Sequence, residues 1–213
     1  MPIAPNVAFN DLTNNVTGFL KKYPVRIFGA TAASGVVAYC LKNRGASFRP
    51  GSVLGTLSMK ATESFDIRAM AAIAAVGGVG NGQVFNAHSV HMDLNQAAMH
   101  FYNLDNAGPN IMVTGQLSGC SFVMRAGAAG SVDVAHVSPA GTTGALLIAA
   151  LQAAFPAALI YGVGSYDSND RVVSILGVRG GTGWRIFAQK HDATSGDYRI
   201  KSVYQIWPAR TKL

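Results

Sequence analysis

The spacing of apolar residues near the start of the chain is helical. Over residues 9–22 apolar side chains recur every three or four positions, and Asn and Lys fill the opposite side, which predicts a surface helix. Residues 61–76 are rich in alanine and predict a second helix, which ends at the glycine-rich run 77–82. Between these helices, residues 50–60 predict a turn followed by a short strand.

From residue 88 onward the pattern becomes that of a β-protein. Turn signals such as DNAGPN at 105–110 separate segments of alternating or β-branched residues. The predicted strands cover residues 97–104, 111–117, 121–125, 131–138, 157–166, 172–178, 184–189 and 198–207. A further helix is predicted over residues 142–155. Because strands dominate and βαβ alternation is absent, we predict the α+β class: a mixed β-sandwich core flanked by a few helices, in a single domain of residues 1–213.

The composition is that of a folded chain. The 213 residues are 49% hydrophobic and 13% charged, a balance that excludes disorder. The longest apolar run, residues 69–80, is much shorter than the ~20 residues that cross a bilayer. Residues 1–15 lack the pattern of a signal peptide. We therefore expect a soluble protein without membrane contact, in which Cys40 and Cys120 remain thiols.

The net charge of +7 is unevenly distributed along the chain. Residues 1–60 carry seven basic and one acidic side chain, and residues 171–213 carry eight and two, so each segment has a net charge of +6. Residues 61–170 carry two basic and seven acidic side chains, a net charge of −5. The basic residues are scattered rather than gathered with aromatic residues on one element, so we expect no nucleic-acid partner. Attraction to an acidic protein stays open.

Cys120 is the candidate nucleophile. It follows Gly119 at the entry to a predicted strand, a position that displays a side chain at the end of a sheet. A cysteine nucleophile reacts as the thiolate, which a neighbouring base generates or stabilises. The backbone N–H groups of Ser118 and Gly119 can point outward at such a turn, and we expect them to stabilise an oxyanion.

His136, sixteen residues after Cys120, is the candidate base. If the hairpin is symmetric about Ala128, the two residues are directly opposed, with Cβ atoms about 4.5–5.5 Å apart. We then expect both side chains on one face, either as a thiolate–imidazolium pair or as a thiol beside a neutral base. Asp133 faces the other way from His136 in a strand, whereas Thr114 on the preceding strand can orient the imidazole.

Two other interpretations of these residues are weighed against the catalytic one. Free cysteine is among the most buried residue types, so Cys120 and His136 could simply pack in the core. His88, His91 and His100 lie close together in the sequence, but the odd spacing of the first two separates them by face in a strand. We therefore predict no metal site.

The segment TGQLSGC at 114–120, followed by a strand, a short turn and AHVSP at 135–139, resembles the catalytic domains of the cytotoxic necrotizing factor family, and is most similar to its stand-alone lethal-factor type. The L-S-G-C motif of that family is matched by residues 117–120, and its histidine on the next strand by His136. Thr114 matches the threonine that stands six residues before the cysteine. The resemblance covers residues 110–140 closely and elsewhere extends only to the order of elements.

This resemblance implies side-chain deamidation of a specific glutamine in a host protein. Cys120 would form a thioester, His136 would move the proton, Thr114 would orient the imidazole, and no cofactor or metal would be needed. The resemblance further implies a monomeric bacterial effector that is secreted or injected and acts in the host cytoplasm, on a target such as a Rho-type GTPase or a translation-initiation helicase. A transglutaminase, another thiol hydrolase and a non-catalytic β-sandwich binding module remain the alternatives.

Overall fold

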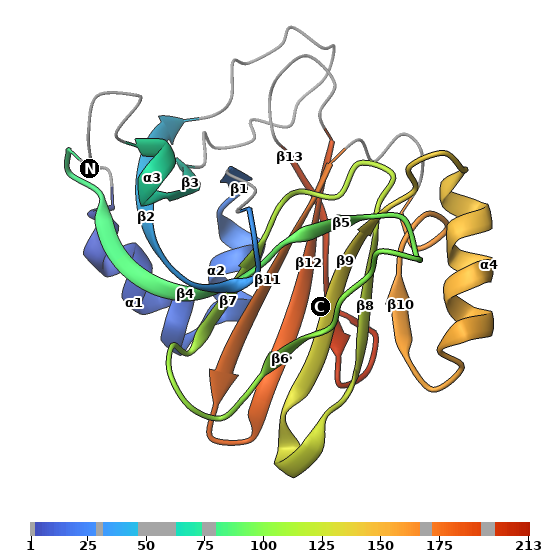
Figure 1. The fold of residues 1–213 in the computed structure, drawn as a ribbon. Helices are drawn as coiled ribbons and strands as arrows, with labels where there is room; N and C mark the ends of the chain where they lie inside the picture. Colours follow the sequence, from blue (N-terminus) through green and yellow to red (C-terminus); the bar gives the residue numbers. More distant parts are fainter. Residues whose placement is uncertain (1–2, 29–31, 47–62, 74–79, 167–171, 193–198) are drawn as a thin grey trace, which may run out of the picture.

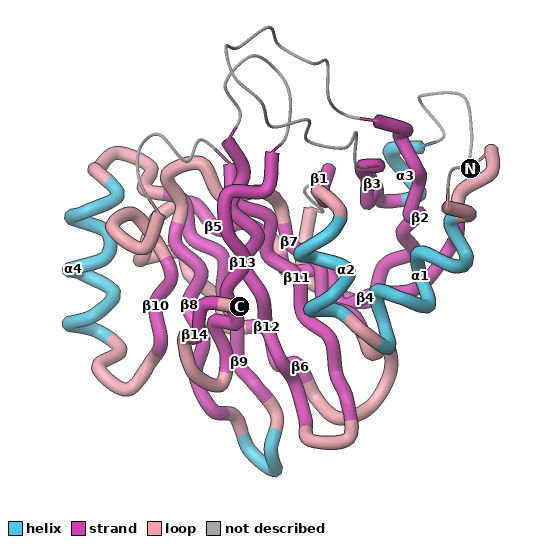
Figure 2. Tube along the Cα trace, turned by 180° about the vertical axis from the view of Figure 1, so that it is seen from behind, coloured by secondary structure: helices cyan, strands magenta, loops and turns pink. Residues whose placement is uncertain are grey.

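Two β-sheets and the helices on their outer faces form four layers in this protein (Figures 1 and 2). The computed structural model describes residues 3–28, 32–46, 63–73, 80–166, 172–192 and 199–213. The α+β sandwich predicted from the sequence is confirmed. The strand predicted within residues 50–60 lies outside the described residues.

The helices are α1 (Pro5–Asn14), α2 (Val16–Lys22), α3 (Met70–Ile73) and α4 (Gly144–Ala154). The nine-stranded sheet contains, in spatial order, β1 (Val25–Phe28), β3 (Glu63–Ala69), β2 (Gly35–Ala46), β4 (Gln83–Val90), β7 (Ile111–Thr114), β11 (Val172–Gly180), β12 (Gly183–Asp192), β13 (Arg199–Trp207) and β14 (Thr211–Lys212). The second sheet contains, in spatial order, β10 (Leu159–Tyr161), β8 (Ser121–Ala126), β9 (Val132–Ser138) and β5 (Met92–Leu94), and β6 (Tyr102–Leu104) also pairs with β9.

The alternation of side chains along each strand creates separate cores on the two faces of the sheets. On β11, Leu176 and Val178 face α1 and α2, whereas Val173 and Ile175 face the second sheet. On β9, Val134 points into the core between the sheets, and Ala135 and Val137 point to the outer side. The space between the two sheets is therefore one continuous apolar core. The candidate site residues Thr114, Cys120 and His136 are buried beside this core.

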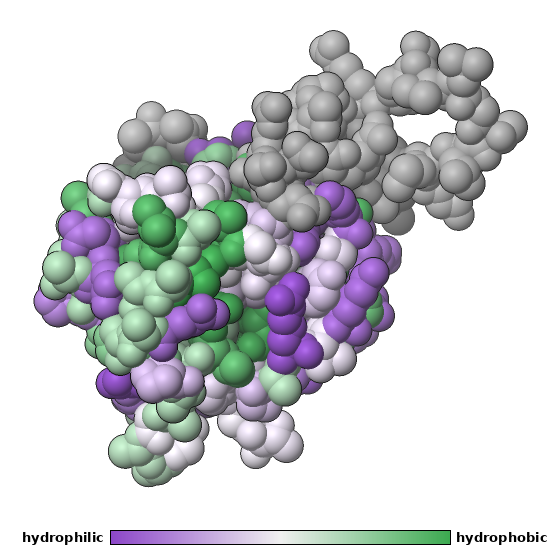
Figure 3. Space-filling model, turned by 90° about the vertical axis from the view of Figure 1, so that its right-hand side faces the viewer, coloured by the Kyte–Doolittle hydropathy of each residue, from purple (hydrophilic) through white to green (hydrophobic). Residues whose placement is uncertain are grey.

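The helix α4 covers the outer face of the second sheet. Leu147 and Leu151 pack against β8 and β9, and the Thr143 hydroxyl accepts a hydrogen bond from the Leu146 N–H at the start of the helix. The rest of α4 is mostly alanine without any charged residue. Figure 3 views this side of the molecule and shows an apolar region beside a more hydrophilic one. Leu146 of α4 and Leu159 of β10 are exposed large apolar side chains.

Two of the predicted helices differ from the structure. The helix predicted over residues 9–22 is divided into α1 and α2 at Asn15, whose φ of −138° and ψ of 56° are not helical and whose side chain accepts a hydrogen bond from the Gly18 N–H. The helix predicted over residues 61–76 is wrong in its first half, where β3 is a strand. Strand β3 pairs with β1 on one side and β2 on the other, and these partners outweigh the local preference of the sequence.

Candidate active site

The segment that carries Cys120 crosses from one sheet to the other. After β7, Leu117 exchanges two backbone hydrogen bonds with Val173 of β11, and its side chain is completely buried. The chain then turns through Ser118 and Gly119 and enters β8 of the second sheet. Gly119 has a φ of +113°, a conformation that side-chain-bearing residues rarely adopt. The sharp turn places Cys120 at the edge of the core between the sheets, where it is 7% exposed.

The pairing of β8 with β9 differs from the prediction by two residues. His136 is opposite Phe122, not Cys120, because the tight turn over residues 127–131 centres the hairpin on Ala129 rather than Ala128. A shift of two residues keeps the same face, so Cys120 and His136 still share the inner face of the sheet. They are diagonal neighbours, a relation in which long side chains remain within reach of one another.

Thr114 orients the imidazole of His136. Its Oγ1 lies 2.8 Å from His136 Nδ1 and donates its own proton to the Val90 carbonyl at 2.9 Å. Since the hydroxyl has one proton, it must accept from His136, and Nδ1 therefore carries the hydrogen. Thr114 ends β7 on the inner face of the nine-stranded sheet, and His136 faces it from β9. The contact that the sequence assigned to Thr114 is present, and the side-chain hydroxyl makes it.

The other imidazole nitrogen, Nε2, is left as a proton acceptor with no hydrogen-bond partner. His136 is completely buried, and its Nε2 is one of few buried side-chain atoms without a partner among the described residues. The pKa of His136 is lowered to about 4, mainly by burial and to a smaller extent by nearby His91, while Asp93 acts in the opposite direction. The imidazole is consequently neutral near pH 7 and is available as a base.

The thiol of Cys120 is also neutral in this structure. Burial raises its pKa above the ordinary cysteine value, and hydrogen bonds from the Ser118 backbone and the Ser138 side chain oppose that shift. Ser138 lies two residues beyond His136, which places it on the same face of β9 as the histidine. The thiolate–imidazolium pair that we expected as one of two states is not supported, since burial disfavours both charged forms. The second state, a thiol beside a neutral base, agrees with the geometry.

The hydroxyl of Tyr166 holds the backbone in place just before and just after the Cys120 side chain. This hydroxyl accepts from the Gly119 N–H at 3.0 Å and donates to the Cys120 carbonyl at 2.6 Å. The Gly119 N–H was expected to stabilise an oxyanion, and this expectation is wrong for the structure described, because that N–H is bonded to Tyr166. The Ser118 N–H remains a candidate donor, since it lies at the Cys120 sulfur.

Met92 and Tyr166 are the site residues that the sequence did not identify as such. Met92 lies opposite His136 in the parallel pairing of β5 with β9, and its Sδ is 3.7 Å from Cys120 Sγ. No local signal predicts this contact, because β5 has only three residues and its partner strand lies more than thirty positions away in the sequence. Tyr166 follows β10 at a turn, where it pairs with Val163, and its hydroxyl reaches the backbone of Gly119 and Cys120, more than forty positions earlier in the sequence.

Asp133 is not part of this arrangement. Its carboxylate accepts from Asn103 at 2.7 Å and from Arg125 at 3.2 Å on the outer face of β9, as the alternation predicted. Among the residues described, no three His, Cys, Asp or Glu side chains gather in a way that could hold a metal ion. None of the described helices has the length and apolar character needed to cross a membrane.

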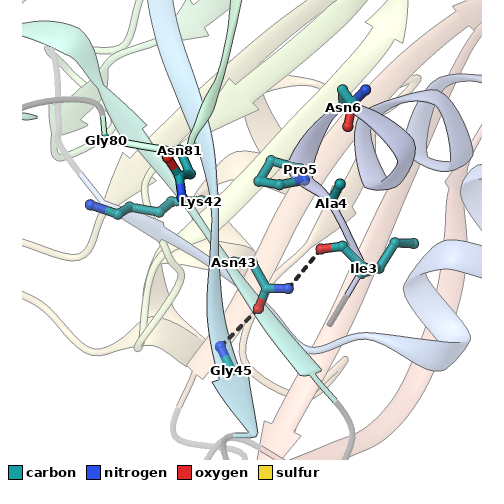
Figure 4. A pocket seen from close by; sticks show the side chains of 9 residues that line it. All are labelled: Ile3, Ala4, Pro5, Asn6, Lys42, Asn43, Gly45, Gly80 and Asn81. Atoms are coloured by element: carbon teal, nitrogen blue, oxygen red, sulfur yellow. Dashed lines mark hydrogen bonds between the residues drawn. The ribbon is translucent and has the colours of Figure 1, made fainter. Parts of the chain in front are cut away.

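A surface hollow of about 840 Å³ lies away from Cys120, where the start of α1 approaches β2 (Figure 4). The side chain of Asn43 lies in this hollow, where it donates a hydrogen bond to the Ile3 carbonyl at 2.9 Å and accepts one from the Gly45 N–H at 2.8 Å. The asparagine thus ties the N-terminal segment to the sheet. Lys42 also lines the hollow, and within the described part of the chain none of the lining residues has a buried side-chain nitrogen or oxygen without a hydrogen-bond partner.

No protein-family model matches the chain, and no curated protein matches it significantly. The assignment of a function therefore rests on the site itself.

Proposed function

We propose that the chain is a protein-glutamine deamidase in which Cys120 is the nucleophile, His136 the general base and acid, and Thr114 the residue that orients the imidazole. The observation that carries this proposal is the orientation of His136. Its Nδ1–H is fixed on Thr114, and its Nε2 is a buried acceptor without a partner on the face that Cys120 shares. An unpaired buried acceptor costs about 1–3 kcal/mol, and this one lies on the face of the sheet that carries a cysteine, where a thiol can supply the missing proton.

The reaction follows from these positions. His136 Nε2 takes the thiol proton as Cys120 Sγ attacks the carboxamide carbon of a glutamine side chain. The imidazolium returns that proton to the amide nitrogen, the C–N bond breaks, and ammonia leaves behind a thioester. Water then attacks the thioester with its proton passing to Nε2, and the thiol departs with that proton, leaving glutamate. The N–H of Ser118, at the sulfur, supports the oxyanion of each tetrahedral intermediate.

The biological setting of the proposal comes from the resemblance to the cytotoxic necrotizing factor family. On the strength of that resemblance, the proposal is a bacterial effector that is secreted or injected and that modifies a protein in the host cytoplasm. A Rho-type GTPase and a translation-initiation helicase are the two target classes that the resemblance offers. A transglutaminase would use the same thioester with an amine in place of water.

The test is to incubate the protein with a eukaryotic cell lysate and to identify, by peptide mass spectrometry, glutamines that have become glutamates. We expect conversion at a small number of sites in intact chains, abolished by Cys120→Ser and by His136→Ala. Cys40→Ser is the matched control, since Cys40 is buried on β2 in another part of the molecule. Cleaved chains would instead indicate a peptidase, and incorporation of an added primary amine would indicate a transglutaminase.

A non-catalytic binding module is the second candidate, and the burial of Cys120 is the observation that favours it. The two candidates differ in the reactivity of the thiol. For a deamidase, alkylation of Cys120 by iodoacetamide is slowed by His136→Ala at a pH where the imidazole is neutral. A thiol whose alkylation rate does not depend on His136, in a protein that leaves all glutamines unchanged, would assign the chain to the binding module.

A further inference from the structure

The side chain of Met92 crosses the strand that carries His136. Strands β5 and β8 lie on opposite sides of β9, so their backbones are roughly 9–10 Å apart, twice the spacing of neighbouring strands. The Met92 and Cys120 sulfur atoms are nevertheless 3.7 Å apart. Both side chains must therefore lean over β9, and they meet above the face on which His136 lies.

Because of this contact between the two sulfur atoms, the thiol of Cys120 points to Met92 and not to His136. The Cys120 S–H donates to the thioether of Met92, whereas His136 Nε2, the acceptor that catalysis needs, has no hydrogen-bond partner. A thioether is a weak acceptor, so the contact does not hold the thiol strongly. The side chain of Met92 does fill the space above β9. It is thus part of the cover that leaves Cys120 only 7% exposed.

We propose that Met92 is the specificity-determining wall of the nucleophile's subsite, and that the side chain of the substrate glutamine must displace it to bring a carboxamide to Cys120. This inference rests on the proposed function. Methionine suits the position because its unbranched chain has three rotatable bonds and can move at low cost. Once displaced, it presents an apolar surface to the methylene groups of glutamine, and the thiol is free to turn toward Nε2.

The experiment measures the rate of Cys120 alkylation by iodoacetamide, read by peptide mass spectrometry, in wild type and in Met92→Val. Valine favours a strand but is too short to reach across β9. We expect the rate to rise about tenfold, equivalent to a free-energy difference of about 1.4 kcal/mol. Met92→Leu keeps the side-chain volume and is expected to stay within about threefold of wild type. The completely buried Cys40 reports on unfolding in the same digest, because it reacts only if the fold opens.

Met99→Val is the matched control, since Met99 is also partly buried but packs against the outer core beneath α4. A rise in Met99→Val equal to that in Met92→Val, or no rise in Met92→Val while Cys40 stays protected, would overturn the inference. If Met92→Val exposes Cys40, Met92→Phe replaces it, because its larger ring covers the thiol more completely. Alkylation of Cys120 should then be slower than in wild type, and an unchanged rate with Cys40 still protected contradicts the inference.

The double variant Met92→Val, His136→Ala separates this inference from the proposed function. If the rise in rate is lost in the double variant, both the wall and the catalytic pair are supported. A rise that persists without His136 supports Met92 as the cover of the thiol but removes the support for His136 as its base.

Discussion

At the scale of single residues, the candidate site depends on hydroxyl groups that hold other groups in place. Thr114 determines which nitrogen of His136 carries the proton, and Tyr166 bonds both the N–H before Cys120 and the carbonyl of Cys120 itself. Neither hydroxyl needs to touch the substrate. Each is a positioning group, so its removal should change the chemistry more than the binding of substrate.

Thr114→Val removes the hydroxyl and keeps the branched shape of the side chain. We expect the kcat of deamidation to fall roughly 10²-fold with little change in KM, because Nδ1 loses the acceptor that fixes the tautomer. Thr114→Ser should restore most of the rate. An unchanged kcat in Thr114→Val, with the protein folded, would show that the hydrogen bond to His136 has only a structural role.

Tyr166→Phe leaves the Gly119 N–H without its partner in a partly buried turn and the buried Cys120 carbonyl without its donor. We expect a loss of about 1–3 kcal/mol in the free energy of unfolding, measured with urea, together with a lower kcat. Tyr39→Phe is the matched control, because the Tyr39 hydroxyl also makes a buried hydrogen bond, at 2.8 Å to Ser89, in the core beneath α1. It should lose stability without a specific loss of kcat, and equal effects on kcat would contradict the assignment to Tyr166.

At the scale of elements, the crossover from the nine-stranded sheet to β8 positions the nucleophile. Leu117 anchors the segment on β11, and four residues later the chain begins β8 of the other sheet. This geometry requires the positive φ of Gly119. The hairpin from β8 to β9 then brings His136 to the same face, and α4 covers the back of both strands.

Gly119→Ala tests the crossover. No atom lies within 4 Å of an added Cβ there, so its cost is the backbone conformation alone, about 1–3 kcal/mol in the free energy of unfolding. We also expect slower alkylation or deamidation, since the turn that presents Cys120 would change. Gly35→Ala also meets no atom within 4 Å, and its φ is not positive, so it should be close to neutral by the same urea measurement.

At the scale of the whole molecule, two buried histidines couple folding to pH. Burial lowers the pKa of His136 to about 4 and that of His191 to about 3, from 6.5. Both are neutral in the folded protein, whereas the unfolded chain binds protons on them below pH 6.5. Their contribution to stability is therefore complete above pH 6.5 and is lost as the pH falls toward their folded-state pKa values.

We expect the free energy of unfolding to fall by a few kcal/mol between about pH 6.5 and pH 4, with a shallower fall in His191→Gln and His136→Gln. Urea unfolding at several pH values measures this slope. His100→Gln is the control, because that side chain is 86% exposed, and its curve should follow that of wild type. A slope unchanged in all three variants would show that these buried histidines do not determine the acid sensitivity.

Much of the fold and part of the site could be predicted from the sequence. Strands β8 and β9, the helix α4 and the strands from β11 to β13 were located by alternation and turn signals. Strands β1, β2 and β4 were missed, and β3 was predicted as a helix, because these strands are defined by partners far along the chain. The pairing of β8 with β9 was predicted two residues out of register, since the five residues of the turn do not by themselves fix its centre.

The sequence alone determined which residues share a face, because a strand reverses its side chains at every residue and the hairpin partners are close in the chain. It thereby placed Cys120 with His136 and excluded Asp133. It also named Thr114 as the partner of His136. The tertiary structure decided the rest of their surroundings: Met92 across β9 and Tyr166 at the turn. These contacts join segments that only the packing of two sheets brings together, and the same packing withdraws both groups from water and keeps them neutral.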